Sequence, residues 1–531
     1  MILASAFPEA PPSMFGHIFM QLSSAKTADL KQIGLFDQGL NFAAVIPKDA
    51  GIEMAYKGMF GGYEGHFTVA PFYQMLAEYS HTEERDLWIY KLNLSQAETT
   101  DLLLHVWEIE MNQSYLAYFF LDENCAYQLL SILQVIRPNT ELTSGFGAYA
   151  LPVTAIQFLE ANGFLSATRT VRRAPAKVAR AMIDELSDAD RETLNEVLTG
   201  KSAHTHLTKP LLAIALKQLT SEKQSVRGRW EPQKDLLLSQ LLQRQSKDPL
   251  PLEHGPNSLE TSSQTQTLSS AEQTSSDQPL LAHWPAQWWI SSGIMRAEIS
   301  EDFSTTSNVE SDHFGKNLAL FDLGFKPALH DPLARGPGFG EGMFLDVFST
   351  TVRLKRLPDQ QTQMKLHKFE LIDIGVFQPI TQERISSSWR IKSSFESDHL
   401  EGPLMFRSIG RTGLTSKLAK TRTVGYSLVG LDLGLKPDFL TSWFGPAFTF
   451  GISGADAWDT HRLSPWSWSL SGDFVAAFAR SWKHPVVRTS VHAELAWIPS
   501  YESNSEFRLA LRHIKFEKIQ TEVLGTLGRH F

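Results

Sequence analysis

The carboxy-terminal half of the chain alternates apolar and polar residues with a period of two, and this pattern restricts the fold most. In WSWSLSGDFVAAFAR, residues 466–480, Trp, Leu and Phe fall on one face and Ser and Asp on the other. Successive side chains of a β-strand point to opposite faces, so this period predicts strands. RTSVHAELAWIP (488–499) and FRLALR (507–512) repeat the pattern. About ten to twelve such segments follow Trp284, separated by Gly, Pro, Asp and Ser.

Two all-β antiparallel folds fit these strands: a soluble sandwich and an outer-membrane-type β-barrel. Ten of the 13 tryptophans lie from Trp284 onward, and aromatic residues gather near strand ends, as in membrane barrels. The chain stops on Phe531, in alternation with Val523 and Leu527, which resembles the closing strand of such barrels. Arg529 on the same face and the charged residues 515–518 depart from that pattern. We predict the barrel and keep the sandwich as the alternative.

Composition changes along the chain divide it into four regions. The first mixes short strands and helices, the second is charged and helical, and the third is rich in Ser, Thr and Gln with few large apolar residues, so it cannot bury a core. The predicted regions are an α+β domain at 1–164, a helical extension at 165–245, a disordered linker at 246–280 and the β domain at 281–531.

Charge and hydropathy exclude several classes of partner. A formal net charge of −9 gives no reason to expect nucleic acid. No run of eighteen apolar residues is present, so a membrane-spanning helix is not expected. The amino terminus has no signal peptide pattern. Because ILASAF already reads as a strand, we expect the true start to lie upstream, in a truncated or mis-started chain.

Cys125 is the only cysteine, so no intramolecular disulfide can form. It stands in FFLDENCAYQLLSILQVI, where Asn124 is a good N-cap for an apolar helix that begins at the cysteine. The free N–H groups and positive dipole of the first turn favour a thiolate and can hold an oxyanion. The alternative is a small buried hydrophobic residue.

A nucleophile needs a base, and His17 is the candidate among 17 histidines. In PPSMFGHIFMQL it lies in a predicted strand and shares a face with Phe15 and Phe19. A satisfied core histidine is the alternative. We expect no catalytic role for His66 and His105.

Five motifs occur in order: PSMFGHIF, KGMFGGYEGHFTVAPFYQMLAEY, ERDLWIYKLNLS, HVWE and YFFLDENCAYQLL. Together they resemble the DUF4105 family, which contains the bacterial lipoprotein N-acyltransferase Lnb. The resemblance covers roughly residues 3–165, with a weaker echo to about 245. The region after Trp284 resembles the β-rich part of longer Gram-negative members. The resemblance implies a circularly permuted papain-like (NlpC/P60-like) thiol domain, in which the histidine strand precedes the cysteine helix.

The resemblance also implies roles for individual residues. Cys125 is the implied nucleophile, His17 the base and Asn41 the group that orients the imidazole. The implied substrate-binding and cleft-shaping residues are Gly61, Gly62, Tyr63, Gly65 and Asn124. A structural ion pair is the expected role of Arg85 and Asp86. No cofactor and no metal is expected.

The function implied is that of a cell-envelope acyltransferase working through a Cys125 thioester, with a lipid or lipoprotein as acyl donor or acceptor. The expected location is the periplasm and outer membrane of a Gram-negative bacterium, with the β domain as the part in contact with the outer membrane. A cysteine peptidase or amidase acting on peptides or peptidoglycan, and a non-enzymatic barrel scaffold, are the alternatives. An apolar channel beside Cys125 would favour lipid chemistry, and a polar open groove would favour an amidase.

Overall fold

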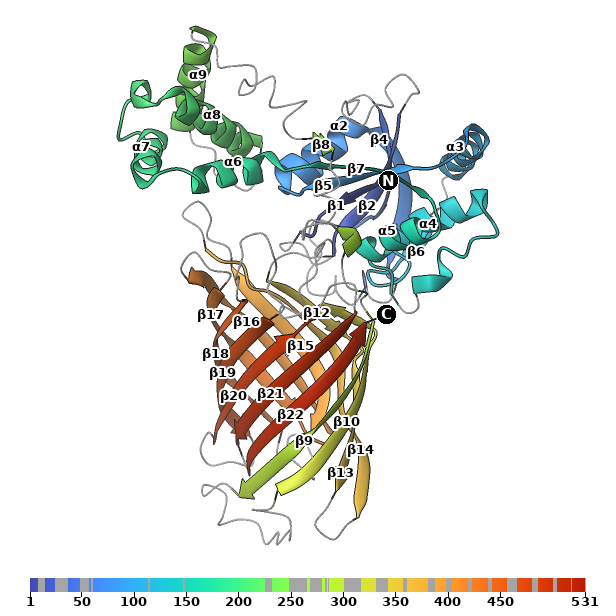
Figure 1. Cartoon of the computed structure of the whole chain (residues 1–531), viewed down its shortest axis with the longest axis vertical. Helices are drawn as coiled ribbons and strands as arrows, with labels where there is room; N and C mark the ends of the chain where they lie inside the picture. Colours follow the sequence, from blue (N-terminus) through green and yellow to red (C-terminus); the bar gives the residue numbers. More distant parts are fainter. Residues whose placement is uncertain are drawn as a thin grey trace. The chain divides into compact units, whose positions relative to one another are not determined.

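The chain folds into two compact units, Met1–Ser275 and Ser276–Phe531 (Figure 1). The boundary falls inside the stretch predicted to be a linker. The computed structural model describes residues 1–7, 15–23, 37–47, 57–58, 61–112, 115–146, 149–224, 232–247, 265–267, 279–281, 284, 286–299, 317–330, 342–356, 361–380, 387–397, 404–418, 423–437, 442–455, 466–479, 486–499, 504–516 and 518–530.

The first unit is built on an antiparallel sheet of eight strands in the order β6-β4-β3-β2-β1-β5-β7-β8. The strands are β1 (Ile2–Ala4), β2 (His17–Leu22), β3 (Gln38–Ala44), β4 (Tyr63–Pro71), β5 (Leu87–Leu92), β6 (Tyr115–Tyr118), β7 (Leu165–Arg172) and β8 (Thr265–Thr267). The short strand β1 lies between β2 and β5, and its three residues are buried. The amino-terminal segment is therefore part of the core.

Helices cover this sheet. They are α2 (Phe72–Met75), the π-helix η2 (Leu76–Thr82), α3 (Gln96–Met111), α4 (Cys125–Ile136), the 3₁₀ turn η3 (Ser144–Phe146) and α5 (Pro152–Ala161). Helix α4 contacts β2 and β3, and α5 contacts β1. The rings of Phe19, Phe72 and Tyr79 pack together where α2 and η2 meet the sheet. The predicted order, a histidine strand followed by a cysteine helix, is present, whereas the papain-like assignment stays a prediction.

Local sequence signals explain where two helices begin. Helix α3 starts with a capping box: the Ser95 hydroxyl accepts from the Glu98 N–H, and the Glu98 carboxylate accepts from the Ser95 N–H. Helix α4 starts after Asn124, whose Oδ1 accepts a 2.8 Å hydrogen bond from the Ala126 N–H.

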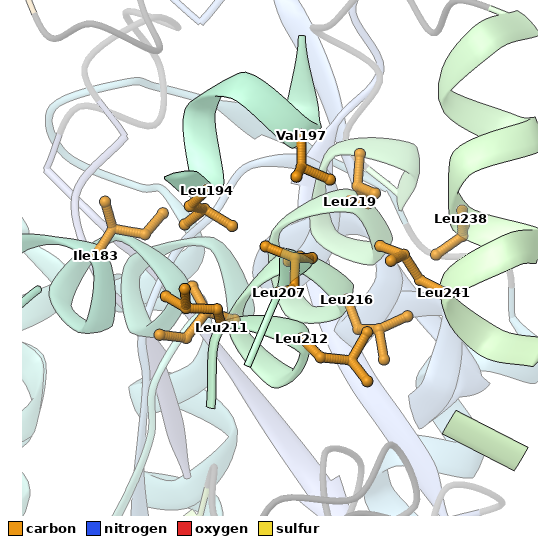
Figure 2. Packing of buried hydrophobic residues seen from close by; sticks show 12 residues of the cluster. Ile183, Leu194, Val197, Leu207, Leu211, Leu212, Leu216, Leu219, Leu238 and Leu241 are labelled. Atoms are coloured by element: carbon orange, nitrogen blue, oxygen red, sulfur yellow. The ribbon is translucent and has the colours of Figure 1, made fainter. Parts of the chain in front are cut away.

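A helical extension follows β7. It contains α6 (Pro175–Asp184), α7 (Asp188–Leu198), the 3₁₀ turn η4 (His204–His206), α8 (Lys209–Gln224) and α9 (Pro232–Lys247). Leu212 and Leu216 of α8 pack in one apolar cluster with Val197 of α7 and Leu241 of α9, as Figure 2 shows. Helices α7 and α9 each bury one stripe, whereas α8 is buried continuously from Leu211 to Lys217, so α8 is the central helix of the extension.

The segment predicted to be a linker holds one piece of regular structure. Strand β8 pairs with β7 at the edge of the sheet, Thr267 opposite Thr170 and Thr265 opposite Arg172. An unpaired sheet edge can bind a polar segment through backbone hydrogen bonds alone, so low hydrophobicity did not prevent this strand. Residues 248–264 and 268–278 of the predicted linker lie outside the described residues.

The second unit contains fourteen described strands. They are β9 (Gln287–Ile299), β10 (Asn317–Lys326), β11 (Ala328–His330), β12 (Met343–Val347), β13 (Thr350–Arg356), β14 (Thr362–Val376), β15 (Ser388–Ser397), β16 (Leu404–Leu418), β17 (Thr423–Leu435), β18 (Trp443–Ala455), β19 (Trp466–Ala479), β20 (Val486–Trp497), β21 (Ser505–Lys515) and β22 (Lys518–His530). Its first strand, β9, pairs with its last, β22, and β14 pairs with β15, so the strands close into a barrel (Figure 1).

The barrel ring has twelve strands, because β11 and β12 continue β10 and β13 across short interruptions. Val347 pairs with Ala328 and Thr350 with Phe325, so both members of each pair stay in register. The interruption between β12 and β13 includes Phe348, whose φ of 54° is in the left-handed region. Closure excludes the sandwich and confirms the α+β unit followed by an antiparallel β-barrel.

Polarity in the barrel is inverted relative to a water-soluble protein. Large apolar side chains point outward and are exposed, among them Ile294, Phe321, Leu431, Phe448, Leu470, Phe474, Val491, Leu509 and Leu527. Charged side chains point inward and are buried, among them Asp322, Arg353, Lys355, Glu370, Arg407, Arg411, Asp432 and Glu522. This is the arrangement of a barrel surrounded by lipid.

Outward aromatic rings pair near both ends of the strands. At the end where β9 begins, Trp466 and Trp497 lie 6.0 Å apart, and at the other end Phe444 and Phe478 lie 6.4 Å apart. Aromatic belts of this kind sit at the two membrane interfaces. Arg529 is exposed near the end of β22. Phe531, on which part of the prediction rested, lies outside the described residues. Among the described helices, none has the length and hydrophobicity needed to cross a membrane.

Candidate active site

The candidate residues meet where the sheet of the first unit opens. The ladder between β2 and β3 consists of three residue pairs, from Met20 opposite Leu40 to Leu22 opposite Gln38. The earlier residues of β2, His17–Phe19, pair with β1, and the later residues of β3, Asn41–Ala44, pair with β4. The two strands therefore part beyond the pair of Met20 and Leu40, which leaves a split in the sheet with His17 on one side and Asn41 on the other.

His17 and Asn41 bridge this split with a side-chain hydrogen bond. His17 Nε2 donates to Asn41 Oδ1 at 2.6 Å. In a neutral imidazole this tautomer leaves Nδ1 without a proton, so Nδ1 is the free base. The ring of Tyr79 lies 5.3 Å from the histidine ring, centre to centre, and limits its rotation. The predicted role of Asn41, orienting the imidazole, agrees with this contact.

Gly16 fixes the backbone just before His17. Its φ is 96°, where residues with a side chain are strained, and a Cβ would lie 3.1 Å from the Ala4 carbonyl oxygen. Glycine at this position lets β2 begin close against β1, and His17 then enters the split directly.

The surroundings of His17 keep the imidazole neutral. The pKa of His17 is lowered to about 4: burial lowers it most, the charge of Arg85 also lowers it, and the hydrogen bond with Asn41 raises it. His17 is therefore unprotonated at neutral pH, which is the state a general base needs.

Cys125 is the first residue of α4, and its thiol is buried beside the same split. It has three hydrogen-bond partners: the backbone of Ile18, the backbone of Ala126 and the side chain of Tyr118. Ile18 is on β2 next to His17, so the thiol lies against the strand that carries the base. The helix start predicted from the sequence is confirmed by this geometry.

The resting thiolate expected from the helix dipole is not favoured by the structure. Burial raises the pKa of the Cys125 thiol above its ordinary value, although its hydrogen bonds and the charge of Arg85 act in the other direction. Desolvation penalises the anion more than the first turn of α4 stabilises it. The resting pair is a neutral thiol and a neutral imidazole.

Arg85 is the buried cation of the site. Its guanidinium donates to the backbone oxygens of Ser5 and Ala4 at 2.6 and 3.0 Å, and pairs with Glu83 at 2.8 Å. The expected pair of Arg85 with Asp86 is wrong, because adjacent residues of a chain entering β5 point apart. Asp86 instead accepts from the Ala174 N–H and pairs with Arg173 and Lys177, tying α6 to the sheet.

The predicted glycine-rich segment packs against aromatic rings. A Cβ on Gly61 would lie 2.4 Å from the Phe119 ring, and one on Gly65 would lie 2.4 Å from the Phe42 ring. A Cβ on Gly62 would lie 2.9 Å from that of Lys57. Tyr63 packs with Phe42, Phe67, Tyr118 and Phe120, and we call these five residues the aromatic cluster. The Tyr63 hydroxyl is buried with no hydrogen-bond partner.

Asn124 uses its amide within the protein. Besides capping α4, its Nδ2 donates to the carbonyl oxygens of Ala150 and Phe120 at 2.7 and 3.2 Å. These bonds fix the loop that precedes Cys125, and a direct contact of Asn124 with substrate stays a prediction. His66 and His105 are partly exposed and lie near Glu64 and Glu108.

Sequence reasoning missed Tyr79 and Tyr118. Tyr79 lies in η2, and π-helical turns are often found at functional sites, but nothing in the sequence marks one there. Tyr118 precedes the cysteine by only seven residues, and this closeness to the candidate thiol was the signal available. Among the described residues, no group of His, Cys, Asp and Glu is arranged to hold a metal ion.

Comparison with known proteins separates the same two regions. Residues 1–162 match the family model of the Lnb N-terminal periplasmic domain. This part of the chain is similar to that domain family. Residues 304–521 match DUF7840, a domain of unknown function. No curated protein matches the chain.

Several solved structures align with the barrel. An outer membrane channel from Pseudomonas putida F1 is 7% identical, over 47% of this chain and 96% of its own, with a TM-score of 0.30. The translocator domain of the autotransporter NalP from Neisseria meningitidis is also 7% identical, over 46% of this chain and 88% of its own, with a TM-score of 0.24. The barrel itself is established by its strand pairing. A periplasmic domain joined to such a barrel belongs in the Gram-negative cell envelope.

Proposed function

We propose that the first unit transfers an acyl group from a lipid ester to an amine, through a thioester on Cys125. The observation that carries the proposal is the meeting of the buried thiol with the strand of His17, whose Nε2 is bonded to Asn41. The Lnb-domain match supports lipid-derived acyl groups and a lipoprotein amine as the acceptor.

In the first step, His17 Nδ1 takes the proton of the Cys125 thiol as the sulfur attacks the ester carbonyl carbon. A carbon–sulfur bond forms and the carbonyl electrons move to oxygen. In this proposal the N–H of Cys125, at the first turn of α4, stabilises the oxyanion. It has no acceptor within the helix and is hydrogen-bonded to the Tyr118 phenolic oxygen in the resting site, from which it passes to the substrate. Collapse breaks the ester carbon–oxygen bond, and the leaving alkoxide takes the proton from His17.

In the second step, an amine attacks the thioester carbonyl and passes its proton to His17. A carbon–nitrogen bond forms, the carbon–sulfur bond breaks, and the thiolate recovers the proton from the imidazole. Because both resting groups are neutral, no ion pair has to be broken before substrate binds. Water in place of the amine would give simple hydrolysis.

The surroundings of the thiol favour an acyl chain over a peptide. Tyr118 links the sulfur to the aromatic cluster, whose members are buried or half-buried. Aromatic and aliphatic walls suit hydrocarbon, whereas an amidase would need hydrogen-bonding groups for a polar chain. The barrel, with its apolar outer surface, would hold the enzyme in the outer membrane beside such lipids.

Intact-mass analysis of the full chain purified from its own envelope tests the proposal. We expect an added acyl mass on the wild-type protein that Cys125→Ala removes. His17→Ala should lower the acylated fraction by at least a hundredfold when lipid is supplied. The matched control is His66→Ala, a histidine outside the split, which should leave acylation unchanged.

Two results would contradict the proposal. One is an acyl adduct that survives in Cys125→Ala. The other is a wild-type protein that forms no adduct with any supplied phospholipid, together with envelope properties that neither substitution alters. The second result would favour a scaffold with an inert thiol.

A further inference from the structure

The thiol of Cys125 has a side-chain partner that the mechanism above does not use. Tyr118 is the last residue of β6, and its phenol is hydrogen-bonded to Cys125 through both the sulfur and the backbone N–H. It is the one buried residue of that strand, since Tyr115, Leu116 and Ala117 are all exposed. A four-residue edge strand that buries a single side chain serves mainly to place that side chain.

The ring of Tyr118 is held firmly. It stacks on Phe42 with ring centres 5.6 Å apart and planes at 16°, and it meets Phe120 edge-on at 6.1 Å. Strand pairing sets Tyr118 opposite Tyr63 of β4. With the ring fixed on two sides and along the strand, the hydroxyl can reach the sulfur without loss of further side-chain freedom.

A buried thiolate needs donors, and the backbone supplies few. The Ala126 N–H is shared, because it also donates to Asn124 Oδ1 at 2.8 Å. Ile18 contributes one backbone contact. A hydrogen bond to a charged group stabilises it more than one between neutral groups, so the phenol matters most once the proton has left the sulfur.

We propose that Tyr118 is a positioning residue that donates its phenolic O–H to the Cys125 thiolate and holds the sulfur at the split of the sheet. Its consequence for turnover rests on the proposed function. The effect of Tyr118 on the reactivity of the thiol does not rest on the proposed function, because this effect depends only on the hydrogen bond.

The test is thiol alkylation of the full chain in detergent, followed by intact mass as a function of pH. The only cysteine of the chain is Cys125, so each added mass reports this sulfur. We expect Tyr118→Phe, which keeps the ring, to slow alkylation about tenfold at neutral pH. The rate at high pH, where the thiolate is fully formed, should be unchanged.

The matched control is Tyr90→Phe. Tyr90 lies in β5 of the same unit, is 1% exposed, and has a hydroxyl without a hydrogen-bond partner. Tyr90→Phe removes the same hydroxyl oxygen from another buried ring and should leave the alkylation profile unchanged. A ring-fluorinated tyrosine at position 118, a stronger donor of nearly the same shape, should speed alkylation at neutral pH and serves if Tyr118→Phe does not fold.

An alkylation profile of Tyr118→Phe within twofold of wild type at every pH would overturn the proposal. A uniform change at all pH values would also overturn it, because that indicates altered access rather than a lost donor. A pH-selective change in a protein that never forms an acyl adduct would uphold the role of Tyr118 and refute the proposed acyl transfer.

Discussion

Leu133 of α4 and Leu470 of β19 show how differently the two units treat the same side chain. Leu133 is 0% exposed within the core of the first unit, whereas Leu470 is 43% exposed on the outside of the barrel. Charge is sorted in the opposite way. In the first unit a buried charged side chain such as Arg85 is an exception, whereas in the barrel Arg353, Arg407 and Arg411 are all buried.

The difference teaches that alternation identifies the two faces of a strand but not the medium that each face meets. In the first unit water is outside, so burial of apolar surface stabilises the fold. In the barrel the outer face meets lipid, and the polar groups satisfy one another inside. Substitutions that move charge should therefore have opposite effects in the two units.

The largest effect is expected from breaking a buried ion pair of the barrel. Arg353 donates to both carboxylate oxygens of Asp322 at 2.7 and 2.8 Å and to Glu522 at 2.6 Å. Arg353→Met leaves two carboxylates unpaired, and we expect it to destabilise the barrel by about 3–5 kcal/mol. The measurement is the urea midpoint of the heat-modifiable band on gels. Adding Asp322→Asn and Glu522→Gln should recover most of the loss. An unchanged midpoint in Arg353→Met would mean that the inside of the barrel is well hydrated.

The next effect compares one substitution in both units. Leu470→Arg places a cation on the outward face of β19, with an expected loss of about 2–4 kcal/mol near the bilayer midplane. Leu236→Arg, on α9 of the first unit at 62% exposure, should change stability by less than about 0.5 kcal/mol. Urea titration in lipid vesicles checks both. Equal tolerance at the two sites would contradict a lipid-facing barrel surface.

A smaller effect depends on pH and belongs to the first unit. The pKa of His17 is about 4 in the folded protein, because the ring is buried, against 6.5 ordinarily. Between these values the unfolded chain binds a proton that the folded chain does not, so stability falls as the pH drops below 6.5. We expect about 2 kcal/mol to be lost by pH 5.

The helical circular dichroism signal in urea reports this unit. His17→Gln should reduce the dependence on pH, and His66→Gln should leave it as it is. A slope that His17→Gln does not alter would show that His17 binds its proton in the folded state. For activity, the same pKa predicts that kcat/KM holds down to about pH 5 and falls near pH 4.

The smallest effect concerns a helix cap. Ser95→Ala removes one half of the capping box of α3 and should destabilise the first unit by about 1 kcal/mol. The same circular dichroism measurement detects it, and the barrel band on gels should not move. A shift of that band would indicate that the two units unfold together.

Local signals carried much of the candidate site. The Asn124 cap and the start of α4 at Cys125 follow from residues within one short motif, whereas the pairing of His17 with Asn41 was implied only by the family resemblance. Tyr79, Tyr118 and the backbone of Ile18 reach the site through strand pairing and helix packing, which no single stretch of sequence displays. The prediction of a thiolate at Cys125 was wrong for a related reason. The dipole of a helix is a local property, whereas the burial of the thiol depends on all the elements packed around it.

For the fold, alternation placed Trp466, Leu470 and Phe474 on one face, and the structure has them there, facing outward. It could not decide between sandwich and barrel, because that depends on whether distant strands pair. The polar strand β8 was missed since its partner is a free sheet edge, where Thr170 lies 97 residues before its partner Thr267. Pairing of this kind leaves no periodic mark in the sequence.

The closure of the barrel has a consequence for the order of assembly. Neighbouring strands of the ring are mostly joined by short connections, but Gln287 meets His530, 243 residues later. Bringing such distant segments together carries the largest entropy of loop closure, so this seam should form last. The first unit shares no strand with this seam, so it can complete its own fold before the barrel closes.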